Sequence, residues 1–221
     1  MMVSREELAR MIDHTQLHAY ATQGDIDKLC DEAVRYGFGA VAINPAWTSH
    51  CAKRLAGAPV KVDATIGFPL GASTTHIKVE EAREAVHNGA EEVDMVVNIG
   101  AVKSGHLDLM AREIDAVVRA VKDVPVKVIL ETCYLTNDEK KAVCEACVRA
   151  RAAFVKTSTG FGNAGATVED VRLMREVVGE ALGVKAAGGV RTYADAMAMI
   201  EAGATRIGTS AGVDILAGMP S

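Results

Sequence analysis

Short apolar runs alternate with amphipathic helical segments along the whole chain, and this alternation constrains the fold more than any other feature of the sequence. Eight runs are predicted to be strands, at residues 11–15, 40–44, 60–66, 92–98, 126–131, 153–157, 183–187 and 205–209. Helical segments are predicted between them, at about residues 24–37, 46–56, 75–89, 106–122, 137–151, 168–181 and 193–203. Strict alternation is typical of a parallel sheet. Eight units favour an α/β fold in the form of one closed (β/α)8 TIM barrel over an open doubly wound sheet, with a single domain spanning residues 1–221.

Helix start and stop signals support these boundaries. Thr136-Asn137-Asp138-Glu139 has the pattern of a capping box, and Thr167 and Thr192 are natural N-caps. Gly37, Gly89 and Gly203 are expected to end their helices, and a positive φ is expected at Gly89 and Gly203. No GxGxxG fingerprint follows the first strand, which argues against a dinucleotide-binding fold.

Composition excludes several classes of function. The net charge is -5, only 4% of the 221 residues are aromatic, and the basic residues are interspersed with acidic ones. We therefore expect no nucleic-acid partner, because a phosphate-backbone binder normally presents a basic face. No apolar stretch suits a membrane span or a signal peptide, so we expect a cytoplasmic protein without a membrane partner. Cys144 and Cys147 fall inside a helical segment and are expected to be reduced core residues.

Two lysines at the ends of short apolar runs are the strongest candidates for chemistry. Lys156 and Lys185 lie on the sixth and seventh predicted strands, which are neighbours in a barrel, so their amines are expected to approach one another. Burial and a second positive charge each lower the pKa of an amine. A lysine that is partly neutral near pH 7 can attack a carbonyl carbon. The alternative is that both are surface lysines that end ordinary strands.

In TIM barrels, reacting side chains project from the carboxyl ends of the strands. That rule selects Asp13, Asn44, Asp94, Asn98, Lys156 and Lys185. Asp94 lies in an apolar run and needs a buried partner, for which the two lysines are candidates. A purely structural ion pair is the alternative. Lys61 and Lys127 also interrupt strands, which is consistent with a wider charged network inside the barrel.

Glycine-bearing turns indicate phosphate recognition. They follow the sixth, seventh and eighth strands, and the last two positions commonly bind phosphate through backbone N–H groups in barrels. The histidines do not cluster at metal-ligand spacing, so no metal is expected. The residues expected to bind substrate and phosphate are Gly160, Gly188, Gly189, Gly208, Thr209 and Ser210, together with Asp13.

Several motifs in order make the chain resemble the deoxyribose-phosphate aldolases, a family of Schiff-base (class I) aldolases. They are Ile12-Asp13-His14-Thr15, Gly67-Phe68-Pro69-Leu70-Gly71, Glu92-Val93-Asp94-Met95-Val96, Lys127-Val128-Ile129-Leu130-Glu131-Thr132, Phe154-Val155-Lys156-Thr157-Ser158-Thr159-Gly160, Val184-Lys185-Ala186-Ala187-Gly188-Gly189-Val190-Arg191 and Gly208-Thr209-Ser210. The resemblance implies that Lys156 forms the Schiff base. It also implies that Lys185 perturbs the pKa of Lys156 and joins proton transfer, and that Asp94 takes part in a proton relay.

The resemblance further implies a carbon–carbon lyase that cleaves 2-deoxy-D-ribose 5-phosphate to acetaldehyde and D-glyceraldehyde 3-phosphate in deoxyribose phosphate catabolism. No metal or organic cofactor is expected, and family members often form homo-oligomers, as dimers or larger assemblies. The chain departs from the family pattern at Phe161, where some members have lysine, at Ala211, at Leu17-His18-Ala19 and in ending at Ser221 without a tyrosine-bearing tail.

Two other functions remain open from the sequence. One is a different class I aldolase or a transaldolase, which would accept ketone donors such as dihydroxyacetone phosphate. The other is a sugar-phosphate-binding barrel without catalysis, whose lysines serve as structural ion pairs.

Overall fold

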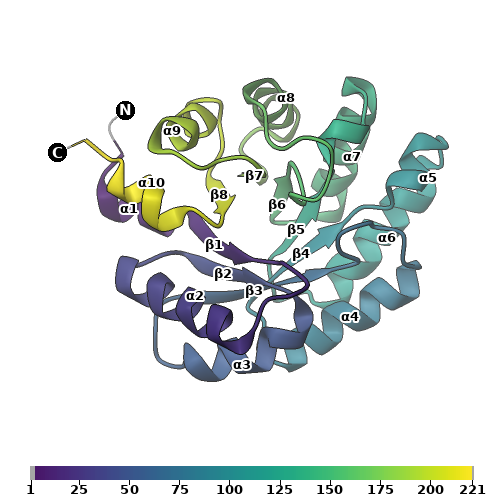
Figure 1. Cartoon of the computed structure of the whole chain (residues 1–221). Coiled ribbons are helices and arrows are strands. Elements are labelled where there is room, and N and C mark those ends of the chain that lie inside the picture. The colour runs from purple at the N-terminus through teal and green to yellow at the C-terminus, as the bar shows by residue number, and fades with distance from the viewer. Residues whose placement is uncertain (1–2, 221) are drawn as a thin grey trace.

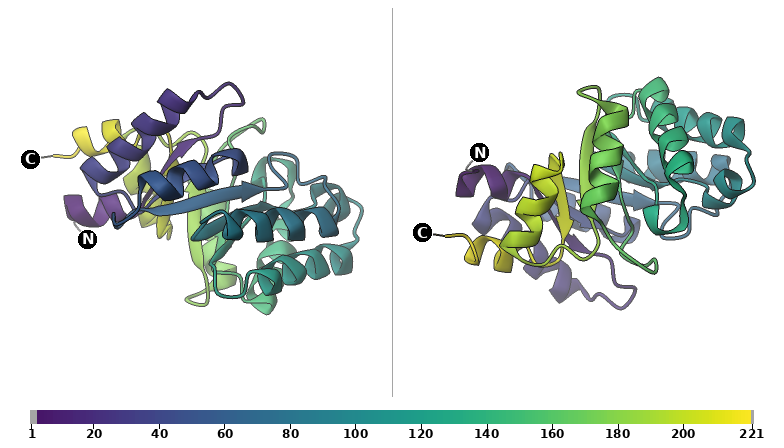
Figure 2. Two further views of the ribbon diagram at one scale, coloured as in Figure 1. Left: turned by 90° about the horizontal axis from the view of Figure 1, so that it is seen from below. Right: turned by 90° about the horizontal axis from the view of Figure 1, so that it is seen from above.

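The computed structural model describes residues 3–220, which form a barrel of parallel strands wrapped by helices (Figures 1 and 2). The strands pair in sequence order and β8 pairs with β1, so the sheet closes. The fold predicted from the alternation is therefore confirmed. The strands are β1 (Ile12–Gln16), β2 (Ala40–Ile43), β3 (Lys61–Ile66), β4 (Glu92–Val96), β5 (Val126–Ile129), β6 (Phe154–Lys156), β7 (Gly183–Ala187) and β8 (Arg206–Thr209).

The main helices lie outside the strands, as Figure 2 shows from two sides. They are α2 (Gln23–Tyr36), α3 (Thr48–Arg54), α4 (Thr75–His87), α6 (Leu107–Ala120), α7 (Asn137–Ala150), α8 (Val168–Val178) and α9 (Tyr193–Glu201). The predicted caps are confirmed. The Thr136 side chain accepts a hydrogen bond from the Glu139 N–H in a complete capping box, and Thr167 and Thr192 cap α8 and α9.

Several short helices and a 3-10 turn were not predicted from the sequence. They have three to six residues, too few to show an amphipathic repeat. Four predicted strands also end early. β2 and β6 end one residue early, and two end two residues early: β4 stops at Val96 because Asn98 caps the next helix, and β5 stops at Ile129. The missed elements are α1 (Arg5–Arg10), α5 (Ile99–Lys103), α10 (Gly212–Ala217) and the 3-10 turn η2 (Thr132–Tyr134). The 3-10 turn η1 (Pro45–Trp47) begins the helical segment predicted at about 46–56.

The apolar core lies between the strands and the surrounding helices. Val93, Met95, Val126 and Val128 belong to this core and are fully or almost fully buried. Side chains alternate along a strand, so the intervening residues point to the barrel axis. Those residues include Asp94 and Lys127, which lie opposite one another in the β4–β5 register. The barrel axis is therefore charged and its outer layer is apolar.

The helix cysteines behave as predicted. Cys144 and Cys147 are buried on α7, and burial raises the pKa of both thiols, in Cys144 to about 12. No helix within residues 3–220 is both long and apolar enough to cross a membrane.

A buried ion pair fastens the outer helices to the end of β4. The Nζ atom of Lys78, on α4, donates to Glu113 Oε1 at 2.6 Å and to the carbonyl oxygen of Val96 at 2.8 Å. Glu113 Oε1, on α6, also accepts the backbone N–H of Asn98 at 3.0 Å. Lys78 is completely buried and Glu113 almost so. The pair therefore sets the position of the strand that carries Asp94.

We predict that Lys78→Met lowers the free energy of unfolding by about 3 kcal/mol, because it leaves the Glu113 carboxylate buried without its cation. Denaturant titration measures the change. The double variant Lys78→Met/Glu113→Gln is expected to recover part of the loss, since the uncompensated charge is gone. Equal stability of Lys78→Met and the wild type would contradict this account.

Candidate active site

One carboxylate at the centre of the barrel joins three amines. Asp94 Oδ2 accepts hydrogen bonds from Lys156 Nζ and Lys185 Nζ, each at 2.7 Å, and Asp94 Oδ1 accepts one from Lys127 Nζ at 2.9 Å. Lys156 and Lys185 are direct partners in the β6–β7 register, so the strand pairing itself brings their amines together. The structure thus unites the three residues that the sequence predicted for catalysis.

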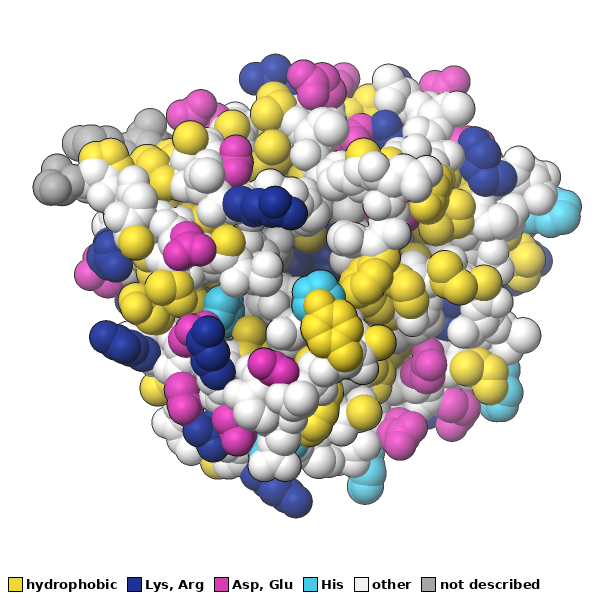
Figure 3. Space-filling view, viewed as in Figure 1, with side chains coloured by type: hydrophobic (Ala, Val, Ile, Leu, Met, Phe, Trp, Pro, Cys, Tyr) yellow, Lys and Arg dark blue, Asp and Glu magenta, His cyan; other side chains and the backbone are white. Residues whose placement is uncertain are grey.

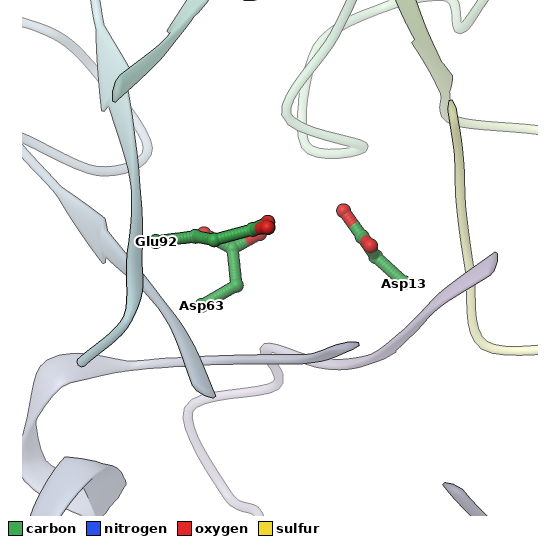
Figure 4. A group of neighbouring side chains, drawn as sticks. All are labelled: Asp13, Asp63 and Glu92. Atoms are coloured by element: carbon green, nitrogen blue, oxygen red, sulfur yellow. The ribbon is translucent and has the colours of Figure 1, made fainter. Parts of the chain in front are cut away.

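A second set of carboxylates surrounds two of these amines, those of Lys127 and Lys185. Asp13, Asp63 and Glu92 converge from β1, β3 and β4, as Figure 4 shows, and their nearest oxygens lie within 4.8 Å of one another. Lys127 Nζ lies 2.8 Å from both Asp63 Oδ2 and Glu92 Oε2. Lys185 Nζ lies 2.5 Å from Asp13 Oδ2 and 3.0 Å from Asp63 Oδ2. The amines lie among these carboxylates and balance their charge.

This environment gives the two lysines opposite tendencies. Burial lowers the pKa of Lys156, and the charge of Lys185 lowers it further, while Asp94 opposes both. Lys185 is also buried, but Asp13, Asp63 and Asp94 hold its pKa well above the usual range. Lys156 is therefore the amine that loses its proton more readily. The sequence predicted a lowered pKa for one of the pair; burial, rather than repulsion, is its largest cause.

Asp94 stays ionised for the opposite reason. Its burial favours the neutral acid, but Lys127, Lys156 and Lys185 together hold its pKa well below the usual range. An ionised carboxylate with three amine donors can accept or return a proton without moving. Asp94 Oδ2 thus joins Lys156, which lines the cavity, to Lys185 beneath it.

A cavity of about 380 Å³ lies directly above Lys156 at the carboxyl ends of the strands. Its wall includes all the glycine-bearing turns that were predicted to bind phosphate, after β6, β7 and β8. Lys156 is only 3% exposed and belongs to the cavity lining, whereas Asp94 and Lys185 lie beneath it. In Figure 3 this face is hollowed near its centre, with dark-blue side-chain atoms deep in the hollow. The lining residues are Thr15, Gln16, Leu17, His18, Lys156, Thr159, Gly160, Phe161, Ala187, Gly188, Gly189, Val190, Arg191, Gly208, Thr209 and Ser210.

Aromatic side chains gather at one side of the cavity mouth. The His18 ring stacks on Tyr20 with centroids 4.9 Å apart, and it meets the edge of Phe161 at 6.5 Å. Phe161 in turn packs edge-on against Phe68 at 5.4 Å. Phe161 and His18, two of the positions where the chain departs from the family pattern, thus share one rim.

A buried glutamate supports the turn after β6. Glu131 has a left-handed backbone with φ 54°, and its carboxylate accepts both the N–H and the hydroxyl of Thr159. A Cβ atom on Gly162 would come within 2.9 Å of the Glu131 carboxyl carbon, so this turn lies directly on the glutamate. Burial raises the pKa of Glu131 despite the bonds to Thr159. Glu131 therefore fixes the segment that forms one wall of the cavity.

The structure places Asp13 outside the cavity lining. This residue was predicted to bind substrate, but it is completely buried, does not line the cavity and pairs with Lys185 and Arg206. Burial raises its pKa, but Lys185, Lys127 and Arg206 outweigh that effect and bring the pKa to about 2. A permanently ionised carboxylate in this position repels a phosphate. Asp13 belongs instead to the ion-pair network.

Two other strand-end residues serve the backbone. Asn44 donates to the Leu17 carbonyl oxygen, and Asn98 caps α5. Lys127 does belong to the predicted charged network, and Lys61 joins it from its half-exposed edge through Glu92 at 3.3 Å.

Sequence reasoning missed Asp63, Glu92, Arg206, Glu131 and Arg191. Acidic residues inside the apolar runs of β3 and β4 were the available signal for Asp63 and Glu92. Nothing local distinguishes Arg206 from a surface arginine, whereas Arg191 follows the predicted phosphate turn Gly188-Gly189 by two residues. Within residues 3–220, the cavity lining contains one lysine, Lys156, and one arginine, Arg191.

Comparisons with known proteins agree with this geometry. Residues 8–218 match the model of the DeoC/LacD family aldolases. The chain is 59% identical over 216 residues to a deoxyribose-phosphate aldolase of Thermococcus gammatolerans, and 57% identical over 212 residues to one of Streptococcus pneumoniae, with 96% of both chains covered in each case. Among solved structures, it is similar to a tetrameric deoxyribose phosphate aldolase from Aeropyrum pernix, with a TM-score of 0.91 and 34% identity over 97% of this chain and 91% of that one.

We predict that Glu131→Ala speeds amide hydrogen exchange at Thr159 by about tenfold, because a hydrogen bond to a charged acceptor is lost. Hydrogen–deuterium exchange read out by NMR or peptide mass spectrometry measures the effect over residues 159–162. Glu131→Gln keeps an acceptor oxygen and is expected to show a smaller change. Unaltered exchange in Glu131→Ala would show that the glutamate does not hold this turn.

Proposed function

This chain belongs to the DeoC/LacD family of aldolases, and on that premise we propose that it reversibly cleaves 2-deoxy-D-ribose 5-phosphate to acetaldehyde and D-glyceraldehyde 3-phosphate. The observation that carries the proposal is the position of Lys156. Its amine lies at the floor of the cavity, has a lowered pKa and is bonded to Asp94, while glycine turns suited to a phosphate surround it.

In the proposed cycle, neutral Lys156 attacks the aldehyde carbon of the open-chain sugar. The carbinolamine loses water to form an iminium, in which the nitrogen carries the positive charge. Loss of the proton from the hydroxyl on C3 breaks the C2–C3 bond and releases D-glyceraldehyde 3-phosphate. The bonding pair moves into the enamine that remains on Lys156. Protonation of the enamine carbon and addition of water then release acetaldehyde and restore the lysine.

Asp94 and Lys185 would move the protons of this cycle. Asp94 Oδ2 lies 2.7 Å from both reacting-side amines, within the distance at which general acids and bases act. Lys185 is an ammonium ion in the resting site because three carboxylates surround it, so it can give a proton to Asp94 Oδ2 and take it back during the cycle. Lys156 is the nucleophile in this assignment, and Lys185 and Asp94 assist it.

The phosphate end of the substrate would lie among the glycine turns and Arg191. Gly160, Gly188 and Gly189 all have positive φ, between 84° and 88°, a conformation that favours glycine. Because glycine has no side chain, their backbone is left uncovered at the cavity wall. Thr209 and Ser210 line the same wall after β8. Backbone N–H groups with one arginine form a suitable phosphate site.

We further propose a role in deoxyribose phosphate catabolism and assembly as a homo-oligomer. The names of the curated relatives support the first proposal, and the tetrameric relative from Aeropyrum pernix supports the second.

Reductive trapping tests the nucleophile. We predict that 2-deoxy-D-ribose 5-phosphate or acetaldehyde with borohydride gives one covalent adduct, which peptide mapping places on Lys156. Lys156→Leu is expected to abolish the adduct and to lower kcat by at least a thousandfold, because the covalent route is lost.

The matched control is Lys141→Met, which removes an exposed lysine of α7 and is expected to keep full trapping. An adduct on another lysine, or none in the wild type, would overturn the mechanism. Trapping with dihydroxyacetone phosphate but not with acetaldehyde would favour a different class I aldolase. Phosphate binding without any adduct would favour a non-catalytic barrel.

We predict that Arg191→Gln raises KM for 2-deoxy-D-ribose 5-phosphate about tenfold, because a charged hydrogen bond to the phosphate is lost. Turnover of unphosphorylated 2-deoxy-D-ribose is expected to stay the same. Steady-state kinetics with both sugars measure the difference. Arg172→Gln, an exposed arginine of α8, serves as the control. Equal effects on the two sugars would remove Arg191 from the phosphate site.

A further inference from the structure

Asp63 has an unusual position among the carboxylates of the barrel. Its Oδ2 atom contacts Lys127 Nζ at 2.8 Å and Lys185 Nζ at 3.0 Å. Its Oδ1 atom is buried, and no donor among residues 3–220 reaches it. Asp63 does not touch the cavity or Lys156. Any influence on the reaction therefore passes through the charge of the network.

The charges of that network are evenly matched. Carboxylates of Asp13, Asp63, Glu92 and Asp94 face cationic groups of Lys127, Lys156, Lys185 and Arg206. Each of these sets has four members when Lys156 is an ammonium ion; Lys61, which also reaches Glu92 at 3.3 Å, is half-exposed, so solvent screens its charge. A neutral Lys156 leaves one excess negative charge in a fully buried site, which is unfavourable. Without the charge of Asp63, neutral Lys156 would instead be the balanced state.

We propose that Asp63 is a positioning residue for the nucleophile, whose negative charge holds Lys156 as an ammonium ion and so sets the pH range in which its amine can attack. This inference rests on the proposed role of Lys156 as the Schiff-base lysine. The influence travels through Lys185, whose Nζ is shared between Asp63 Oδ2 and Asp94 Oδ2, the oxygen that also binds Lys156.

The surroundings of Asp63 support this assignment. The acidic groups packed around it are Asp94 and Glu92 on β4 and Asp13 on β1. The basic groups that face it are Lys127 on β5, Lys156 on β6, Lys185 on β7 and Arg206 on β8. The neighbouring strand β2 contributes only Ala-Val-Ala-Ile. Burial and the charge of Asp94 raise the pKa of Asp63 to about 6, whereas the pKa values of Asp13, Glu92 and Asp94 are lowered. Asp63 is thus the member of the set whose charge changes near neutral pH.

The test is the pH dependence of Schiff-base formation. Wild type and Asp63→Asn are mixed with acetaldehyde and cyanoborohydride across a pH series, and the rate of adduct formation on Lys156 is followed by mass spectrometry. We expect the acid limb to move to lower pH by about one unit in the variant, which is about a tenfold faster reaction at a fixed pH on that limb. Asp63→Ala is expected to move the limb in the same direction.

A matched control separates charge from folding. Asp170→Asn removes a buried carboxylate that pairs with Lys140 between α7 and α8, away from the barrel axis, and is expected to leave the limb in place. Thermal unfolding confirms that each variant is folded. An acid limb that stays at the wild-type pH, or moves to higher pH, in folded Asp63→Asn and Asp63→Ala would overturn the inference. Absence of an adduct in the wild type would instead refute the proposed function itself.

Discussion

The rest of the site depends on the shared carboxylate of Asp94. Three lysine amines cannot occupy the axis of a barrel unless an anion holds them, because each would repel the others and lose its hydration. Asp94 bonds to all three. The carboxylates behind it compensate the two deeper amines, Lys127 and Lys185. Lys156 has fewer anionic partners and borders the cavity, and its pKa is lowered by burial whereas that of Lys185 is raised by the carboxylates around it.

Strand register places most of the charged residues of the site next to one another. Lys156 and Lys185 are separated by a whole helix in sequence but are direct neighbours in the sheet, as are Asp94 and Lys127. Parallel pairing around a closed barrel allows little freedom once the outward apolar residues are buried, because a one-residue slip would turn the charged set into the helix layer. The pairs that lock helices outside, such as Lys78 with Glu113, hold the strand ends in the same register.

Much of this arrangement could be predicted from the sequence. The alternation of elements gave the barrel, and glycine-flanked lysines with an acid in an apolar run identified Lys156, Lys185 and Asp94. The role of Asp13 could not be predicted, because a strand-end position does not reveal whether a carboxylate faces the cavity or the layer beneath it. Arg206 and Glu131 were missed for a related reason. Their partners lie on strands or turns distant in sequence, and only the closed sheet brings them together.

The matched charges of the barrel axis have a consequence for turnover. In the proposed cycle, an ammonium ion and an iminium ion occupy the same place on Lys156, so the barrel axis carries the same charge in the resting enzyme and in the iminium intermediate. The surrounding carboxylates do not need to reorient when the intermediate forms. The free energy needed to orient them is spent during folding and not during the reaction. Such a site is a preorganised electrostatic environment for one cation. It favours intermediates that keep the positive charge on nitrogen over any that would place it elsewhere.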